Sequence, residues 1–476
     1  MTSSFEYFPG VPILHSRDLV HWCQIGYCLT RDSQLPLHHV PSSGGIYAPT
    51  LRYHDGWFYM VTTNVQGGGH FYVKAQDPAG PWSEPVSIEG PWFDPDLFFD
   101  DDGRVYFSRM NMGQGIYHRE IDLATGQLVG PERIIWLGFE DPYCEAPHIY
   151  KIGGWYYLLV AECGTHRSHA IAVARAKSPT GPFEGCPHNP LLTHRCRIGN
   201  PIEHTGHGDL IQAHDGSWWI VFLAVRTRER RFHLGRETFL APVTWDTDGW
   251  PVINGGRPIE PEMDAPLPPS WPQPAPVVRD DFEDGTLGLQ WNFRRNPIPG
   301  SWSLTERPGW LRLWGAATDL DGASPLTFIG RRQQHFTRRV RTRIAFDPAL
   351  PREEAGLTVL MNEGHHYELG VTRREGKRVV CVRRRIGDLV ADVAIAPLPE
   401  GPVVLAVDAD PEVYRFSFGP DGNRLTPLAS GQVRYLTTAV AGGYTGVTFG
   451  MYATGRGSPR RVPADFDWFD YEPLAE

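Results

Sequence analysis

Residues 138–150 read GFEDPYCEAPHIY, and they place Glu145 directly before an Ala-Pro step and a short β-run. That β-run turns at Ile152-Gly153-Gly154 and continues as the aromatic run Trp155-Tyr156-Tyr157-Leu158. Two such runs separated by a glycine turn are typical of a β-hairpin. We therefore expect the Glu145 side chain to lie where a strand begins, and not in a mobile loop.

The same arrangement recurs along the first half of the chain. Each copy has a small residue or a proline before an aliphatic residue, then a glycine turn and an aromatic second strand. The openers are residues 47–51, 93–97, 145–149 and 206–210, and the second strands are residues 57–60, 105–107, 155–158 and 218–221. Short-stranded modules that repeat every roughly 40–60 residues are typical of propeller blades.

The closing turns of the modules can be counted separately. They lie at residues 17–22, 77–82, 122–126, 178–183 and 246–250, which is one more than the number of openers. The first module therefore begins part-way through its second strand. This pattern predicts an all-β fold with a five-bladed propeller over residues 1–258, whose first inner strand is missing.

Polar residues occupy the opener position of three successive modules, namely Asp94, Glu145 and His207. If the openers are the inner strands of blades, these side chains converge at one mouth of the central channel. An Asp or Glu before a proline can also simply begin a turn. A site with two carboxyl groups, however, is what cleavage of a glycosidic bond needs.

A proline-rich stretch separates the modules from the rest of the chain. Residues 261–276 contain seven prolines and cannot pair in a sheet, so residues 259–277 are predicted to be a stiff linker. Alternating β-runs follow, and they predict a β-sandwich over residues 278–476. The run at residues 465–471 is expected to pair near the first strand of this domain.

Composition excludes several classes of function. The net charge of −10 argues against nucleic acid as a partner, and no run of 18 apolar residues indicates a membrane span. The seven cysteines form no CxxC pattern, so neither a zinc site nor a disulfide framework is predicted. A cytoplasmic location is the simplest interpretation, since no signal peptide is visible, although the N-terminus may be incomplete.

Several motifs resemble glycoside hydrolase family 43, in its β-xylosidase and α-L-arabinofuranosidase branch with a C-terminal concanavalin-like domain. The motifs are SSFEYFPGVP at residues 3–12, SSGGIYAPT at 42–50, DPDLFFDDDG at 94–103 and HLGRETFLAP at 233–242. The resemblance implies an inverting enzyme that needs no cofactor. It would remove terminal β-1,4-xylosyl or α-L-arabinofuranosyl residues from short xylo-oligosaccharides.

The resemblance also implies catalytic roles. Glu145 matches the general acid, and Asp94 matches the aspartate whose charge raises the pKa of the acid and orients it. The family's general base lies in a Pro-Asp-Pro motif of the first inner strand, which this sequence lacks. Asp18 and Asp32 are the nearest aspartates, but both are predicted in turns. Either the protein starts further upstream, which we favour, or it is a shortened homologue without the base.

Substrate contacts follow from the same resemblance, and they are Phe5, Tyr47, Thr165, His207, Arg236 and Tyr444. The family commonly has tryptophan at the position of Tyr47 and phenylalanine at that of Tyr444. For each of these residues, ordinary packing, a turn or a solvated strand is the alternative interpretation.

Metal binding and assembly are also suggested by the resemblance. In some relatives the histidine that matches His207 approaches a central calcium ion, although a hydrogen-bonded structural histidine is the alternative. A calcium ion held by Asp281 or Asp467 is a further hypothesis for the sandwich. Relatives of this branch often form oligomers, so a homodimer or homotetramer is expected.

Two rival functions use the same fold. A sugar-binding protein without turnover would result if the base is truly absent, and a transferase using the same pocket is a third hypothesis. A serine hydrolase is rejected because no GxSxG motif is present. A pocket closed by a second domain favours exo action on short chains over attack within a polymer.

Overall fold

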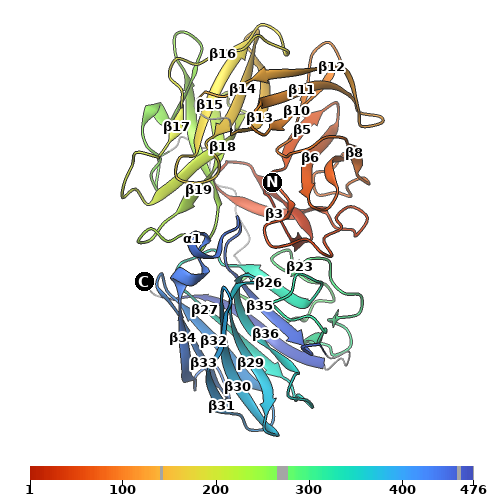
Figure 1. The fold of residues 1–476 in the computed structure, drawn as a ribbon, viewed down its shortest axis with the longest axis vertical. Coiled ribbons are helices and arrows are strands. Elements are labelled where there is room, and N and C mark those ends of the chain that lie inside the picture. Colours follow the sequence, from red (N-terminus) through yellow and green to blue (C-terminus); the bar gives the residue numbers. More distant parts are fainter. Residues whose placement is uncertain (140–142, 265–276, 458–462, 475–476) are drawn as a thin grey trace.

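The structure is a computed structural model that describes residues 1–139, 143–264, 277–457 and 463–474. It is all-β, as predicted, with propeller-like blades followed by a C-terminal β-sandwich (Figure 1). In the described ranges the helical elements are η1 (Asn254–Gly256), η2 (Val433–Leu436) and α1 (Thr438–Ala441). No helix within those ranges has the length and apolar character needed to cross a membrane.

Four blade sheets follow one another along the chain. The first contains β4 (Gly45–Ile46), β5 (Thr50–His54), β6 (Trp57–Val65), β7 (Gly69–Ala75) and β8 (Val86–Ile88). The second contains β9 (Asp96–Phe99), β10 (Val105–Asn111), β11 (Gly115–Asp122) and β12 (Gln127–Trp136). The third contains β13 (Cys144–Ile152), β14 (Trp155–Glu162), β15 (Ala170–Ala176), β16 (Glu184–Gly185) and β17 (Leu192–Thr193). The fourth contains β18 (Ile202–Gln212), β19 (Trp218–Arg226), β20 (Glu237–Trp245) and β21 (Pro251–Ile253).

The first predicted module forms a smaller sheet than the other four. Within the described residues it consists of two antiparallel strands, β2 (Gly10–Ser16) and β3 (Trp22–Leu29). Four full blade sheets are thus present, and the count of five blades stays a prediction.

Hydrophobic clusters lie between successive sheets and fix their order. Val11 of β2 packs in one cluster with Met60 of β6, and Val61 of β6 packs in the next with Phe107 of β10. The clusters continue from the β10 sheet to the β14 sheet and from there to the β19 sheet. Because β6, β10 and β14 each contribute residues to two successive clusters, neighbouring blades share their cores.

The sandwich consists of two large sheets. One has the order β1 (Tyr7–Phe8), β23 (Asn292–Arg294), β26 (Thr327–Arg332), β35 (Thr448–Thr454), β28 (Glu354–Asn362), β29 (His365–Arg374), β30 (Lys377–Ile386) and β31 (Leu389–Pro397). The other has the order β24 (Trp302–Ser303), β25 (Leu311–Trp314), β36 (Pro463–Pro473), β27 (Arg338–Ala345), β32 (Val403–Ala409), β33 (Val413–Gly419) and β34 (Thr426–Gln432). β22 (Arg279–Asp280) pairs with β36, as the sequence predicted.

One large hydrophobic core fills the space between these two sheets. The sheets of the blades lie between residues 10 and 253, and those of the sandwich lie after residue 279 except for β1. Residues 265–276, most of the predicted linker 259–277, lie outside the described residues.

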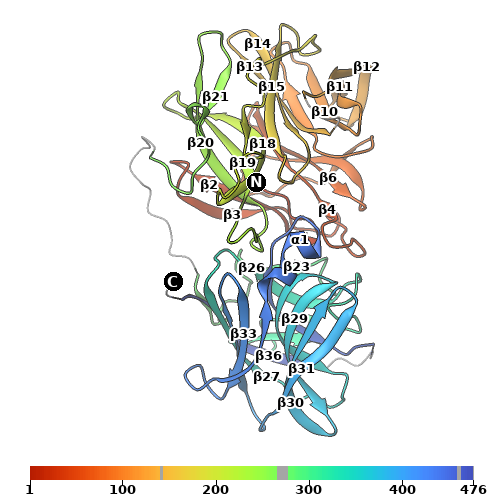
Figure 2. The ribbon, with the colours of Figure 1, turned by 60° about the vertical axis from the view of Figure 1, so that its left-hand side comes forward.

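The two domains share a strand and a set of buried polar contacts. β1 comes from the N-terminal end of the chain and pairs antiparallel with β23 of the sandwich. Next to β23, Asn296 accepts a hydrogen bond from the Leu37 amide at 2.5 Å and donates to the Leu35 carbonyl at 2.8 Å. Both views place α1 at the junction of the domains (Figures 1 and 2).

Two buried arginines continue this interface. Arg294 donates to Ser42 at 2.8 Å and Arg295 donates to the Val40 carbonyl at 2.7 Å, so both reach from the sandwich to the propeller. Both also form an ion pair with Glu363, which follows β28. The interface is therefore built from specific polar contacts.

Candidate active site

The predicted polar residues stand at irregular points of the inner strands. Asp94, just before β9, has a φ of 57°, Ala146 in β13 has a φ of 51°, and His207 in β18 has a φ of 49°. β13 also has a register shift between Glu145 and His148. Positive φ in a residue other than glycine costs on the order of 1–3 kcal/mol and collects at functional sites. A bulge redirects the neighbouring side chain, and here the irregular backbone coincides with the carboxyl groups.

Glu145 and Asp94 interact directly. The Ala146 amide hydrogen-bonds the Asp94 carboxylate, which ties the two openers together. Burial raises the pKa of Glu145, and the charge of Asp94 raises it further, whereas Arg236 lowers it. Burial likewise raises the pKa of Asp94 against the opposing charge of Arg236. The pair therefore retains a proton near neutral pH, which a general acid requires.

Arg236 connects the carboxyl pair to Thr165 and to the loop that carries Tyr444. It directly precedes β20 and interacts electrostatically with both Asp94 and Glu145. Its Nη1 donates to Thr165 Oγ1 at 3.4 Å, and its Nε donates to the Tyr444 carbonyl at 3.3 Å. A planar guanidinium with several donors in this position can bind sugar hydroxyl groups.

Aromatic rings cover one side of the site. The Phe5 ring lies 5.6 Å from that of Tyr47 and 6.0 Å from that of Tyr444, and Tyr47 lies 5.3 Å from Phe93. The Arg236 guanidinium is 5.2 Å from the rings of both Phe5 and Tyr444. Tyr444 belongs to the sandwich, so this domain contributes a ring to the wall of the site.

His207 completes the wall beside Asp94. Its Nδ1 lies 3.9 Å from Asp94 Oδ2, and its ring centroid lies 6.2 Å from that of His148. Burial and the neighbouring His148 lower the pKa of His207 well below its ordinary value, so the ring is neutral. A role in holding a calcium ion stays a prediction.

The structure brings every predicted site residue into one region. The set is Phe5, Tyr47, Asp94, Glu145, Thr165, His207, Arg236 and Tyr444. Asp18 and Asp32 are in turns, as expected: Asp18 accepts hydrogen bonds from the amides of Val20 and His21, and Asp32 contacts His38. The catalytic and binding roles of the set stay predictions.

Sequence reasoning missed a network of charges next to the site. Arg52 of β5 contacts Asp96 at 2.7 Å and Asp209 at 3.3 Å, and its Nη2 lies 3.1 Å from His148 Nδ1. Tyr150 donates a hydrogen bond to Asp209. Asp96 and Asp209 occupy opener segments, so the repeat could have revealed them. Arg52 belongs to no motif that marks it.

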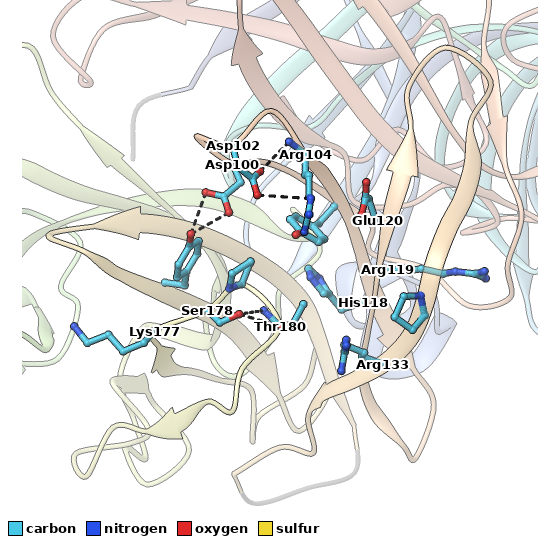
Figure 3. Close-up of a pocket in the computed structure, with 14 residues that line it drawn as sticks. Asp100, Asp102, Arg104, His118, Arg119, Glu120, Arg133, Lys177, Ser178 and Thr180 are labelled. Atoms are coloured by element: carbon cyan, nitrogen blue, oxygen red, sulfur yellow. Dashed lines mark hydrogen bonds and ion pairs between the residues drawn. The ribbon is translucent and has the colours of Figure 1, made fainter.

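A separate polar pocket of 390 Å³ lies between the second and third blade sheets (Figure 3). Asp100, which lines it, follows β9, whereas Asp94 precedes that strand, so the pocket lies at the other end of the blade. Basic and acidic side chains both line it, among them Arg104, which pairs with Asp102 at 3.7 Å. None of the predicted site residues lines this pocket.

Among the described residues, one group of at least three potential metal ligands comprises Asp321, His366 and Glu368 of the sandwich. Burial lowers the pKa of His366, but the hydrogen bonds that the ring donates to Asp321 and Glu368 raise it to about 9, so the metal-free ring is protonated. Arg383 pairs with Glu368 at 3.2 Å and Arg385 pairs with Asp321 at 3.3 Å. This group is better described as a network of charges than as a metal site.

The two aspartates proposed for calcium in the sandwich have cationic partners. Asp281 contacts Arg279 at 2.7 Å, and Asp467 contacts Arg343 at 2.6 Å. The hypothesis of a calcium ion at either position stays a prediction.

Comparison with protein families gives two matches that cover most of the chain. Residues 1–251 match the family described as Glycosyl hydrolases family 43. Residues 279–472 match the Beta xylosidase C-terminal Concanavalin A-like domain.

Individual relatives are similar over nearly their whole length. The chain is 44% identical over 480 residues to a non-reducing end alpha-L-arabinofuranosidase of Bacteroides ovatus, covering 100% of this chain and 90% of that protein. It is 39% identical over 491 residues to a xylosidase/arabinosidase of Butyrivibrio fibrisolvens, covering 99% of this chain and 94% of that protein. A solved structure, Bacteroides ovatus Xyloglucan PUL GH43B, has a TM-score of 0.95 at 43% identity, covering 99% of this chain and 95% of that chain.

Proposed function

Because this chain belongs to glycosyl hydrolase family 43 and is a glycosidase, we propose that it removes one terminal pentosyl residue from short xylo-oligosaccharides. The residue released is β-1,4-xylosyl or α-L-arabinofuranosyl, and the reaction proceeds with inversion. The names of the relatives, an arabinofuranosidase and a xylosidase/arabinosidase, support both sugars.

The pairing of Glu145 with Asp94 carries this proposal. Glu145 is the general acid, because burial and the neighbouring Asp94 favour its protonated form. As the bond between the sugar carbon and the glycosidic oxygen breaks, the Glu145 proton passes to that oxygen. The leaving chain departs with a hydroxyl group, and Glu145 becomes a carboxylate beside the Arg236 cation.

An inverting reaction also needs a base that activates water on the opposite face of the sugar. The two carboxyl groups of such enzymes are roughly 6.5–9.5 Å apart. Asp18 and Asp32 are engaged in turns, and we assign no residue of this chain to the base.

Exo action on short chains is supported by the walls of the site. Tyr444 of the sandwich stacks on Phe5 and contacts Arg236 through its carbonyl, which closes one side of the space around the carboxyl pair. A closed subsite accepts the end of a chain more readily than its middle. We also propose that the chain forms a homo-oligomer, and we assign no surface to the contact between its copies.

A sugar-binding protein without turnover is not supported. The relatives matched over nearly the whole chain are named as glycosidases. The raised pKa of Glu145 also has no evident use in a protein that only binds sugar.

The proposal is tested with the full chain on 4-nitrophenyl β-xyloside, 4-nitrophenyl α-L-arabinofuranoside and xylotriose. We expect turnover of at least one aryl glycoside, release of single pentoses from xylotriose, and a first product of inverted anomeric configuration in proton NMR. A product of retained configuration, or conversion of xylotetraose directly into two molecules of xylobiose, would overturn the mechanism or the exo action.

A further inference from the structure

A second histidine, His169, faces the proposed acid. It directly precedes β15 and is 1% exposed, and its Nε2 lies 3.9 Å from Glu145 Oε1. In the described part of the chain this Nε2 is buried without a hydrogen-bond partner. An unpaired buried polar atom is costly, so its position beside a carboxyl group calls for an explanation.

The other ring nitrogen fixes the tautomer of His169. Nδ1 lies 3.1 Å from the His204 carbonyl oxygen, which can only accept a hydrogen bond. Nδ1 must therefore carry the proton, and Nε2 presents a lone pair to Glu145. Burial lowers the pKa of His169 to about 3, which keeps the ring neutral over the whole working range of pH.

The ring is also held firmly in place. A Cβ at Gly206 of β18 would lie 2.3 Å from Cε1 and Nδ1 of His169, so the ring packs on a position that only glycine leaves open. The backbone of His169 is fixed on both sides, since its amide donates to the His166 carbonyl and its carbonyl accepts from Thr193 Oγ1, each at 2.9 Å. Neither the ring nor its backbone is free to turn away from Glu145.

We propose that His169 is a positioning residue for the acid, and that its Nε2 accepts a hydrogen bond from the protonated carboxyl group of Glu145. This inference rests on the proposed function, in which Glu145 is the acid. A small rotation of the Glu145 carboxyl group closes the distance, and hydrogen bonds of catalytic groups are often long in the empty enzyme. This bond gives the lone pair of His169 Nε2, which otherwise has no partner, a hydrogen-bond donor.

The proposed bond gives His169 a defined part in the reaction. In the empty enzyme the Glu145 O–H group points to Nε2. When a substrate enters, the O–H group turns to the glycosidic oxygen, its proton moves there, and the O–H electron pair remains on Glu145 as a carboxylate. His169 neither gains nor loses a proton. Its lone pair repels the new carboxylate and favours rapid reprotonation of Glu145.

Other charged groups surround the same two residues. Asp94 and Arg236 act on Glu145, with opposite signs. Arg236, His204 and His166 act on His169, and all three disfavour a positive charge on its ring. These neighbours remain in place in variants of His169, so a change in pH dependence reports the loss of the ring itself.

The test compares two leaving groups in His169→Met and His169→Gln. The 2,4-dinitrophenolate group of a dinitrophenyl glycoside leaves without protonation. The phenol of a phenyl glycoside of the same pentose leaves only when the acid protonates it. We expect His169→Met to lower kcat/KM for the phenyl glycoside by about tenfold or more, and to move the basic limb of its pH profile to lower pH. The dinitrophenyl glycoside should change by no more than about twofold. His169→Gln, which places an amide oxygen near the position of Nε2, should recover most of the loss.

His118 of β11 provides a matched control. It is also fully buried, its Nε2 also lacks a partner within the described residues, and burial lowers its pKa to about 4. His118→Met should leave the ratio of the two activities and the pH profile unchanged. Equal losses on both leaving groups in His169→Met, with an unmoved pH profile, would overturn the proposal. If His169→Met does not fold, His169→Leu, which likewise removes the acceptor at Nε2, is measured in its place.

Glu145→Gln separates this inference from the proposed function. If that variant keeps the dinitrophenyl activity and loses the phenyl activity, Glu145 is the acid. The His169 variants then test only the positioning role of His169. If Glu145→Gln hydrolyses the phenyl glycoside like the parent, the assignment of the acid fails whatever His169 does.

Discussion

At the scale of single residues, the function depends on the protonated carboxyl group of Glu145. We predict that Glu145→Gln lowers kcat on xylotriose or on a phenyl pentoside by about 10²–10⁴-fold, because the amide cannot donate a proton to the leaving oxygen. The measurement is steady-state kinetics at the optimum pH. Glu84→Gln is the control, since Glu84 is exposed and pairs with Arg31 away from the site, and it should retain full activity.

The raised pKa of Glu145 predicts the shape of the pH profile. Glu145 is active only when protonated, so activity is present below its folded-state pKa and is lost as the pH rises through it. The basic limb should therefore lie well above the ordinary glutamic acid value of about 4.3. In Asp94→Asn the limb should move to lower pH, because a negative charge beside Glu145 is removed. A basic limb at the same pH in the parent and Asp94→Asn would show that Asp94 does not act on the acid.

The sequence was sufficient to find the carboxyl pair and the residues proposed to contact the substrate, but not His169 or Arg52. Glu145 and Asp94 stand at repeated positions one or two residues before a proline, and such a repeat is visible without coordinates. His169 and Arg52 come from positions with no repeat and no motif. His169 lies beside the acid and Arg52 contacts Asp96, Asp209 and His148 because the inner strands of the blades converge, which depends on strand registers that sequence periodicity does not report.

At the scale of secondary-structure elements, the aromatic second strands were the most predictable. β6, β10, β14 and β19 include every predicted second strand. A short apolar run that follows a glycine turn rarely adopts any structure other than a buried strand. β23 of the sandwich was not foreseen. β23 is only three residues long and owes its place to neighbours on both sides, β1 and β26.

The turn before β20 should be sensitive to a single methyl group. Gly235 has a φ of 74°, and a Cβ there would lie 2.5 Å from the Gly446 amide nitrogen of the sandwich. We predict that Gly235→Ala lowers the free energy of unfolding by about 1–2 kcal/mol for the left-handed backbone and by a further 1–3 kcal/mol for the clash. Urea denaturation measures the total.

Gly216→Ala separates these two contributions. Gly216 has a φ of 85°, but a Cβ there would meet no atom within 4 Å. Its substitution should cost only the backbone part. If the two variants lose the same stability, the contact of Gly235 with the sandwich is unimportant.

The loop after α1 should affect substrate binding more than the chemical step. Tyr444 stacks on Phe5 at 6.0 Å, and the residue is 38% exposed, so it remains available to a sugar. We predict that Tyr444→Ala raises KM for xylobiose or an aryl pentoside by roughly three- to tenfold with little change in kcat, since an aromatic contact contributes about 0.5–1.5 kcal/mol. Tyr444→Phe keeps the ring and should keep KM near the parent value. A fall in kcat with constant KM in Tyr444→Ala would contradict a role in binding.

At the scale of the whole molecule, the two domains are coupled by buried charges. Glu363 pairs with Arg294 and Arg295, whose side chains are completely buried. We predict that Glu363→Gln lowers the free energy of unfolding by about 3–5 kcal/mol, because two buried cations lose their counter-charge. Differential scanning calorimetry and urea denaturation measure this loss. A variant as stable as the parent would mean that the Ser42 hydroxyl and the backbone carbonyls satisfy both arginines without Glu363.

The sharing of β1 limits how freely these two domains can be exchanged between proteins. Tyr7 and Phe8 come from the opposite end of the chain but extend the sheet of β23, where they face Arg294 and Phe293. A sandwich transplanted onto a foreign catalytic domain would therefore arrive with an uncapped edge. Its new host would have to supply a matching pair of residues at its own N-terminus, which makes the architecture less modular than its two family matches suggest.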